Sequence, residues 1–417
     1  MGARVRMTRG HAVLVAVVVV ALLGGAVGAW RLLADHYGER VTGPYGSYPG
    51  TAGTRAELGS FAGPVRLVDG LAVIGAGNRV RSAGGTRTLD NGIAAIDLHT
   101  GSLYWSYRRP GHGVAADTVT RTSTYVLWDD GLLVRLDSRT ARPRWHRRLD
   151  PQRAPRLAPA AGGTLLVAAE QALVAVARAD GAVRWQAHPG AGCAFVTRWE
   201  APAARVVAAG TESHGAGSCH ERVTGYRLNS GRVAWRHSGA GLADWVLPVD
   251  DTTLVDLDAT VWSADSGRRL RTLRHWRDGS AGGGLLFGSD QHGVYATDPS
   301  TDRQLWRRPV PAGEEITGPP VYVDGDDVCV MLRSATGHHT ARLRLACYAP
   351  RTGAAVAGAD VPVVVPTYLS GDERTDFRWS LTATVTAAGA GTLAVTETDA
   401  YLTGLGTAPP TVVLPQP

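Results

Sequence analysis

Short apolar runs, each closed by a polar turn, recur along this chain of 417 residues. In the clearest copy the run 93–96 ends at Asp97, a turn containing Thr100 and Gly101 follows, and Trp105 comes eight residues after the aspartate. The same spacing between an anchor and a second position occurs seven times, at Asp97/Trp105, Asp137/Trp145, Ala177/Trp185, Arg227/Trp235, Ser263/Arg271, Asp298/Trp306 and Ala349/Ala357. The second positions lie 35 to 51 residues apart, a period that indicates a stacked repeat array.

Each copy is predicted to be the end of one strand, a tight turn and the start of the next strand, because the apolar runs are short and bounded by turn residues. A glycine four residues after the anchor would supply a positive φ, and it occurs in five copies, at Gly101, Gly181, Gly231, Gly267 and Gly353. Ala141 and Asp302 replace it in the other two.

Upstream, the runs 65–68 and 71–74 flank Asp69-Gly70 and predict a hairpin. Four strands in about 42 residues make the blade of a β-propeller. We expect the five repeated tryptophans to pack between blades rather than to bind a ligand.

The repeat form A-x-D-x-x-T-G-x-x-x-W, which residues 95–105 match, resembles the PQQ-like propeller family, which includes the BamB-type lipoproteins of outer-membrane barrel assembly. The resemblance covers roughly residues 64–365. It implies an all-β fold, and it leaves function open because one fold hosts many activities.

Quinoprotein dehydrogenases share this repeat, and the resemblance implies that they need a disulfide between adjacent cysteines and a calcium site. The four cysteines here are at 193, 219, 329 and 347, and none are adjacent. No calcium motif can be assigned, and Asp324-Gly325-Asp326-Asp327 is better explained as a hairpin turn. We therefore expect no cofactor, no metal and no catalytic residues, with a PQQ-dependent dehydrogenase as the alternative.

The number of blades depends on the end of the chain. After the seventh copy, the runs 379–385, 392–395 and 400–402 predict three strands without a fourth. A strand from residues 52–62 would complete this blade and close the ring, which removes exposed sheet edges. We expect eight blades over residues 52–417, with seven as the alternative.

The N-terminal region predicts a membrane anchor. Arg4, Arg6 and Arg9 precede an uncharged run over residues 12–30, which is close to the roughly 20 residues needed to span a bilayer. We expect a cytoplasmic segment at 1–11, a transmembrane signal anchor at 12–30, a linker at 31–51 and an extracytoplasmic propeller. Cleavage near Ala29, giving a secreted protein, is the alternative.

The cysteines agree with export. Cys329 and Cys347 flank a predicted hairpin loop, and Cys193 and Cys219 form the natural second pair among three connectivities. Such disulfides would imply an oxidising compartment.

The net charge of +6 does not require a nucleic-acid partner. The arginines cluster just after the repeat tryptophans, where charge on an outer strand blocks edge-to-edge pairing. We expect a non-enzymatic scaffold that binds an envelope protein or a cell-surface polymer. Its candidate contact residues are Glu212, His214, His338 and His339, in long predicted loops.

Overall fold

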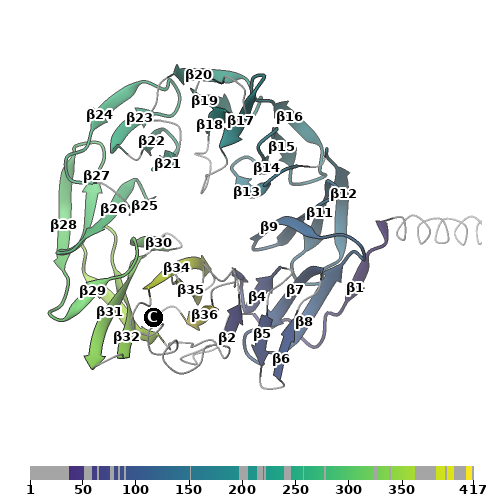
Figure 1. The fold of residues 1–417 in the computed structure, drawn as a ribbon, viewed down its shortest axis with the longest axis horizontal. Coiled ribbons are helices and arrows are strands. Elements are labelled where there is room, and N and C mark those ends of the chain that lie inside the picture. Colours follow the sequence, from purple (N-terminus) through teal and green to yellow (C-terminus); the bar gives the residue numbers. More distant parts are fainter. Residues whose placement is uncertain are drawn as a thin grey trace, which may run out of the picture.

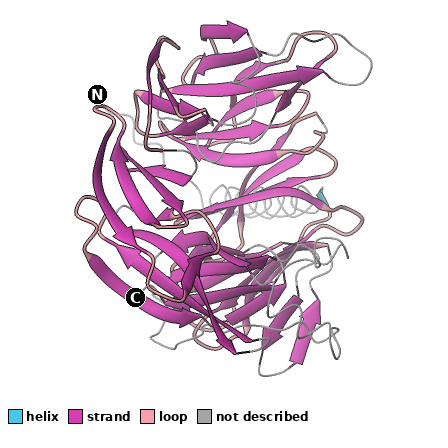
Figure 2. Ribbon diagram, turned by 60° about the vertical axis from the view of Figure 1, so that its left-hand side comes forward, coloured by secondary structure: helices cyan, strands magenta, loops and turns pink. Residues whose placement is uncertain are grey.

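The computed structural model describes residues 37–50, 59–62, 65–75, 79–82, 85–88, 91–150, 152–196, 205–213, 219, 222–238, 246–256, 258–276, 279–323, 327–337, 340–361, 382–389, 392–398 and 410–415. Strands dominate them (Figure 2). None of their helices is long and apolar enough to cross a membrane, and the predicted span at 12–30 lies outside them.

The described strands form eight antiparallel sheets arranged around a centre, as in a β-propeller (Figure 1). The first sheet has the order β1 (Arg40–Thr42), β8 (Leu103–Arg108), β7 (Gly92–Asp97), β4 (Leu71–Ile74) and β3 (Val65–Val68). The second contains β9 (Val114–Thr120), β10 (Ser123–Trp128), β11 (Leu132–Asp137) and β12 (Pro143–Arg148). The third contains β13 (Arg156–Ala160), β14 (Thr164–Ala168), β15 (Leu173–Ala177) and β16 (Val183–Ala187). The fourth contains β17 (Cys193–Val196), β18 (Val206–Ser213), β19 (Arg222–Arg227) and β20 (Val233–Ser238).

The remaining sheets follow the same plan with two additions. The fifth contains β21 (Val246–Pro248), β22 (Thr253–Asp256), β23 (Thr260–Ser263) and β24 (Arg269–Thr272). The sixth contains β25 (Gly279–Gly282), β26 (Leu285–Asp290), β27 (Gly293–Asp298) and β28 (Arg303–Pro309). In the seventh, β29 (Glu314–Ile316) and β30 (Val321–Val323) both pair with β31 (Asp327–Gly337), followed by β32 (Thr340–Tyr348) and β33 (Ala355–Val361). The eighth has the order β34 (Thr382–Gly389), β35 (Thr392–Thr398), β36 (Pro410–Pro415), β2 (Gly59–Ala62), β5 (Arg79–Ser82) and β6 (Gly85–Thr88).

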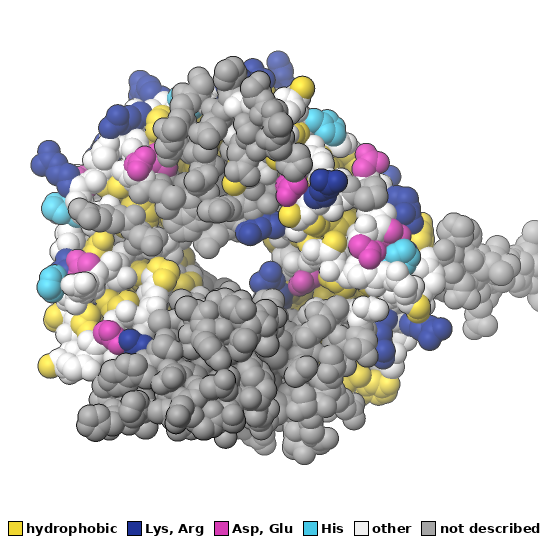
Figure 3. Space-filling model, viewed as in Figure 1, with side chains coloured by type: hydrophobic (Ala, Val, Ile, Leu, Met, Phe, Trp, Pro, Cys, Tyr) yellow, Lys and Arg dark blue, Asp and Glu magenta, His cyan; other side chains and the backbone are white. Residues whose placement is uncertain are grey.

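The antiparallel order gives the molecule two distinct faces. One face, which we call the turn face, carries the turns between first and second and between third and fourth strands, such as Asp69-Gly70 and residues 98–102. The other, the connection face, carries the loops between second and third strands and the connections between sheets, such as 109–113 and 188–192. An opening passes between the sheets at the centre, with charged side chains at its margin (Figure 3).

The repeated tryptophans join each sheet to the next, as predicted. In all five cases the indole Nε1 donates a hydrogen bond to the carbonyl one residue after the anchor of the following sheet. These bonds join Trp105 to Ser138, Trp145 to Arg178, Trp185 to Leu228, Trp235 to Ala264 and Trp306 to Pro350, at 2.6–3.0 Å. In four of the five cases the glycine of the next turn lies against the same ring, so that a Cβ at Gly181 would be 2.7 Å from Trp145 Cε3. In the fifth case the turn that receives the Trp105 bond has Ala141 at this position, in the same buried cluster as Trp105. We call this contact the tryptophan–turn interlock.

The two ends of the chain share one sheet, as expected for a closed ring. Strand β2 pairs with β36 on one side, where Phe61 faces Thr411, and with β5 on the other, where Phe61 faces Val80. The third C-terminal strand is β36, whereas the predicted strand at 400–402 lies outside the described residues. The hairpin β5–β6 leaves the first sheet after β4 and extends the eighth sheet, so a segment from the first repeat covers the closing strand.

The segment that the sequence assigns to a linker contains a strand. β1 pairs with the outer edge of β8, and the Glu39 carboxylate accepts hydrogen bonds from Tyr107 (2.5 Å) and His146 (2.6 Å). Further on, the Tyr48 hydroxyl donates to Asp69 on the turn face. Residues 37–50 therefore form a strap from the connection face to the turn face across the outside of the first sheet.

Both predicted disulfides are present. Cys329 and Cys347 face each other directly in β31 and β32, with their Cα atoms 4.1 Å apart, and both are buried. Cys193 and Cys219 join the start of β17 to the loop before β19.

Candidate functional site

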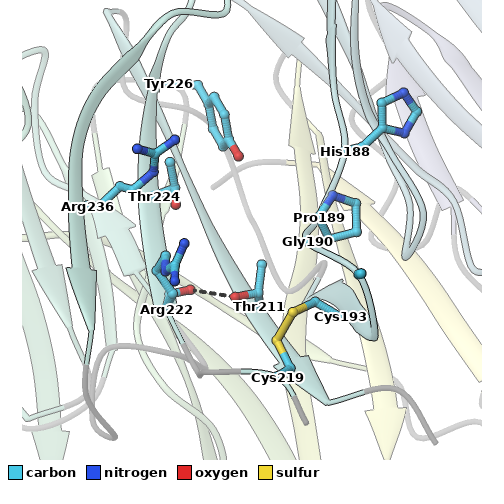
Figure 4. A pocket seen from close by; sticks show the side chains of 11 residues that line it. His188, Pro189, Gly190, Cys193, Thr211, Cys219, Arg222, Thr224, Tyr226 and Arg236 are labelled. Carbon is cyan, nitrogen blue, oxygen red and sulfur yellow. Dashed lines mark hydrogen bonds between the residues drawn. A yellow bond between two sulfur atoms is a disulfide. The ribbon is translucent and has the colours of Figure 1, made fainter. Parts of the chain in front are cut away.

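A pocket of about 390 Å³ lies on the connection face, at the junction of the β13–β16 and β17–β20 sheets (Figure 4). One wall is the face of the β17–β20 sheet that packs against its neighbour, and the opposite wall is the connection from β16 to β17. Its lining residues are His188, Pro189, Gly190, Ala191, Cys193, Thr211, Cys219, Arg222, Thr224, Tyr226 and Arg236.

Alternation along β19 builds the polar wall. Arg222, Thr224 and Tyr226 are two residues apart, so their side chains point to the same face of the sheet. In the neighbouring strands, Arg236 of β20 pairs with Thr224 and Thr211 of β18 pairs with Arg222. Directly opposed Cβ atoms in an antiparallel pair are about 4.5–5.5 Å apart, so these five polar side chains form one continuous patch.

The deeper part of the same interface is apolar and fixes the wall. Tyr226 is 8% exposed and stacks on Trp185, with ring centroids 6.3 Å apart. Phe195 meets the Tyr226 ring edge-on from β17, also at 6.3 Å. Thr224 and Thr211 are buried as well. The pocket walls are therefore held by packed rings below the polar patch.

The electrostatics of the pocket are positive. Burial raises the pKa of Tyr226 above its usual value, whereas the Thr224 hydroxyl and the charges of Arg236 and Arg222 lower it. Neither arginine forms an ion pair with a described residue, and the described lining contains no carboxylate. The pocket thus offers guanidinium and hydroxyl groups without a counter-ion from the described chain.

The Cys193–Cys219 disulfide closes the floor of the pocket. The Cys193 amide donates to the Gly190 carbonyl at 3.0 Å, which ties the connection to the start of β17. The bridge then attaches that point to the loop before β19. Both walls are therefore covalently linked at one end of the pocket.

The sequence-predicted contact residues do not form this pocket. Glu212 was expected in a loop, but its backbone belongs to β18, where it pairs with Ala194 of β17, so that expectation is wrong. His214, His338 and His339 lie outside the described residues. Cys193 and Cys219, which the sequence predicts to be a disulfide in this long repeat, do line the pocket. The sequence analysis did not propose Arg222 and Arg236 as contact residues. Their signal was the alternation Arg222-x-Thr224-x-Tyr226.

Another cluster on the connection face could be considered for a metal. His112 Nδ1 lies 3.1 Å from Asp129, and His112 Nε2 lies 4.0 Å from Asp130. However, Arg109 donates to both carboxylate oxygens of Asp130, at 2.9 and 3.1 Å, and Arg148 adds a third contact at 3.3 Å. The two guanidinium groups already neutralise this carboxylate and would repel a cation.

The cysteines do not match the arrangement that the resemblance to quinoprotein dehydrogenases implies, which is a disulfide between adjacent cysteines. All four cysteines here are used in bridges separated by 26 and 18 residues.

The fold and the repeat define a PQQ-like β-propeller. A family model described as outer membrane protein assembly factor BamB matches residues 89–243 and 220–342, and the chain belongs to this family. No curated protein matches the chain.

The solved structures that are similar to the chain include the following three. BamB from Moraxella catarrhalis has a TM-score of 0.45 at 15% identity, covering 84% of this chain and 96% of that one. The computationally designed Ika8 protein has a TM-score of 0.47 at 13% identity, covering 88% and 99%. Quinohemoprotein alcohol dehydrogenase from Comamonas testosteroni has a TM-score of 0.42 at 13% identity, covering 90% and 76%.

Proposed function

We propose that this protein is a non-enzymatic binding scaffold: an eight-bladed, membrane-anchored propeller on the extracytoplasmic side that holds an envelope protein or a cell-surface polymer through its connection face. The observation that carries the proposal is the inter-sheet pocket, which presents guanidinium and hydroxyl donors on that face. The buried hydroxyl groups of Thr211, Thr224 and Tyr226 are already positioned and can bind a partner without a large ordering cost.

Several features support the location. Two disulfides fit an oxidising compartment. Arg109 donates to the Tyr37 carbonyl near the connection face. Residues 31–37 can span at most about 25 Å, so an anchor at 12–30 would keep the connection face near the membrane surface.

Ring closure supports the count of eight blades. The eighth sheet takes its fourth strand, β2, from the beginning of the chain and its first three from the end. A ring closed in this way has its first and last strands paired, which suits a platform that keeps its shape when a partner binds.

Site-specific photocrosslinking in intact cells tests the proposal. A photoreactive residue at Ala191, exposed on the connection face, is expected to give a discrete adduct. The same residue at Ala179, exposed in the β15–β16 turn on the opposite turn face, is the matched control. Membrane fractionation and titration of the purified protein with PQQ and calcium accompany it. Adducts from Ala179 alone would refute the choice of the connection face. A soluble cytoplasmic location in the fractionation would refute the membrane anchor. Stoichiometric binding of PQQ would favour the dehydrogenase alternative over the scaffold.

A further inference from the structure

Two arginines, Arg222 and Arg236, line the pocket. In other sheets some strand arginines pair with acids, as Arg144 does with Asp137 and Arg344 with Glu314, and others bond to carbonyl or hydroxyl oxygens, as Arg184 does to Gly162 and Thr164. Arg222 and Arg236 have no acidic partner among the described residues, and both line the pocket on the same face of the sheet as the buried Tyr226. Two cations brought together without an anion point to a ligand that brings the negative charge.

We propose that this pocket binds a phosphate ester of a polyol or sugar, with Arg222 and Arg236 holding the phosphate. The inference rests on the proposed scaffold function and gives its ligand a chemical class. Planar guanidinium groups donate two parallel hydrogen bonds to phosphate oxygens, and two of them match a group with up to two negative charges.

The rest of the lining favours a polyol over a peptide anchor. Thr211, Thr224 and Tyr226 offer hydroxyl groups, and His188 adds a ring nitrogen from the opposite wall (Figure 4). The apolar lining is limited to Pro189, Ala191 and the disulfide. Protein partners are usually held by aromatic or aliphatic anchors in apolar pockets, and this lining provides little of either kind of surface.

The size agrees with a small organic phosphate. At roughly 30 Å³ per water, a volume of 390 Å³ equals about a dozen water molecules. That space accepts a phosphate with a short polyol or one sugar ring, whereas a carboxylate side chain alone would fill a small part of it.

The pocket is also rigid enough to select its ligand. The Tyr226–Trp185 stack fixes one wall, and the Cys193–Cys219 bridge fixes the floor. The hydroxyl groups of the buried Thr211, Thr224 and Tyr226 therefore lose little freedom on binding and can select for a polyol next to the phosphate.

Calorimetric titration of the purified full-length, disulfide-intact protein tests the proposal. The probes are glycerol 3-phosphate, inorganic phosphate, glutarate and glycerol. We expect one site for glycerol 3-phosphate, binding at least about fivefold tighter than inorganic phosphate or glutarate, and no binding of glycerol. Arg222→Gln and Arg236→Gln should each weaken binding about tenfold, since each removes a charge-assisted contact.

Arg232→Gln is the matched control, because Arg232 is exposed in a turn of the same sheet on the opposite face and should leave binding unchanged. Thermal unfolding of each variant checks that the sheet stays folded. The proposal fails if glutarate binds as well as the phosphate ester, which would indicate an acidic peptide site, if Arg232→Gln weakens binding equally, or if no probe binds. If no phosphate ester binds but the photoreactive residue at Ala191 still gives a discrete adduct in cells, the proposed ligand class is refuted and the scaffold function is not.

Discussion

A single methyl group at Gly353 tests the tryptophan–turn interlock. Gly353 has a φ of +64°, and a Cβ there would lie 2.5 Å from Cδ2 and 2.8 Å from Cε3 of Trp306. The left-handed conformation costs an alanine about 1 kcal/mol relative to glycine. Overpacking a closed contact costs about 1–3 kcal/mol. We therefore expect Gly353→Ala to destabilise the protein by about 2–4 kcal/mol.

The chain provides its own control at the equivalent position of the preceding sheet. Asp302 has a φ of +57° and already carries a side chain, because the sheet before it has Arg271 in place of tryptophan. Asp302→Ala removes only an acceptor for the exposed Arg274 amide, at 3.1 Å, so it should cost about 1 kcal/mol or less.

Differential scanning calorimetry measures both changes. An unfolding entropy of about 2.1 cal/mol/K per residue gives roughly 0.9 kcal/mol/K for this chain, so Gly353→Ala should lower Tm by about 2–5 °C and Asp302→Ala by about 1 °C. In a Trp306→Phe background, the added cost of Gly353→Ala should shrink because the smaller ring leaves space. Equal shifts for the two alanine variants, or an unchanged cost with phenylalanine, would refute the steric argument.

Two further predictions concern buried pairs. Arg109 holds the pKa of Asp130 well below its usual range, so this pair stabilises the protein above the unfolded pKa of about 4 and its contribution is lost as the pH falls toward the folded pKa. Asp130→Asn should therefore lower the free energy of unfolding by about 2–4 kcal/mol at pH 7. In unfolding measurements the difference in stability between the variant and the parent should narrow below about pH 4. A difference that does not change with pH would contradict this. The double change Cys329→Ala and Cys347→Ala removes a bridge between residues 18 apart and should lower the free energy of unfolding by about 3 kcal/mol. The expected readout is a Tm lower by about 3–4 °C. An unchanged Tm would show that the bridge does not constrain the unfolded chain.

The repeat signature predicted the sheets well because each copy encodes its own contact with the next. The Trp185 position and the glycine at 231 belong to different repeats, yet each is readable locally, as a strand residue and a turn residue. The Cys329–Cys347 bridge was predictable for the same reason, since both residues lie in one hairpin.

The additions to the sheets could not be predicted from the repeat. β1 and the hairpin β5–β6 lie outside the repeated pattern, and their partners are strands of another repeat or of another sheet. Glu212 was misassigned because a long repeat suggests a long loop, whereas the extra length partly extends β18 against β17. The pocket depends on which face of β19 meets the preceding sheet, and alternation in one strand does not reveal its neighbour.

Two of the departures from the signature can be related to the junction that follows. Arg271 replaces tryptophan where the next turn has Asp302 instead of glycine, whereas Trp105 is kept opposite Ala141, whose side chain is a single methyl group. Ala357 replaces it before the eighth sheet, whose third and fourth strands, β36 and β2, come from opposite ends of the chain. No third-to-fourth turn joins those two strands, so an indole there would have no turn carbonyl to bind.

The tryptophan–turn interlock also explains how an inter-sheet pocket can exist without weakening the ring. At the junction that holds the pocket, Trp185 closes the turn-face side by its bond to the Leu228 carbonyl, and a Cβ at Gly231 would lie 2.6 Å from the same ring. On the connection-face side the two sheets can then lie further apart and carry polar side chains between them. The interlock on the turn face and the Cys193–Cys219 bridge at the pocket floor maintain the spacing of the sheets. A ligand bound between Arg222 and Arg236 would contribute to a junction that is already closed, which is the arrangement expected of a site selected for binding rather than for holding the propeller together.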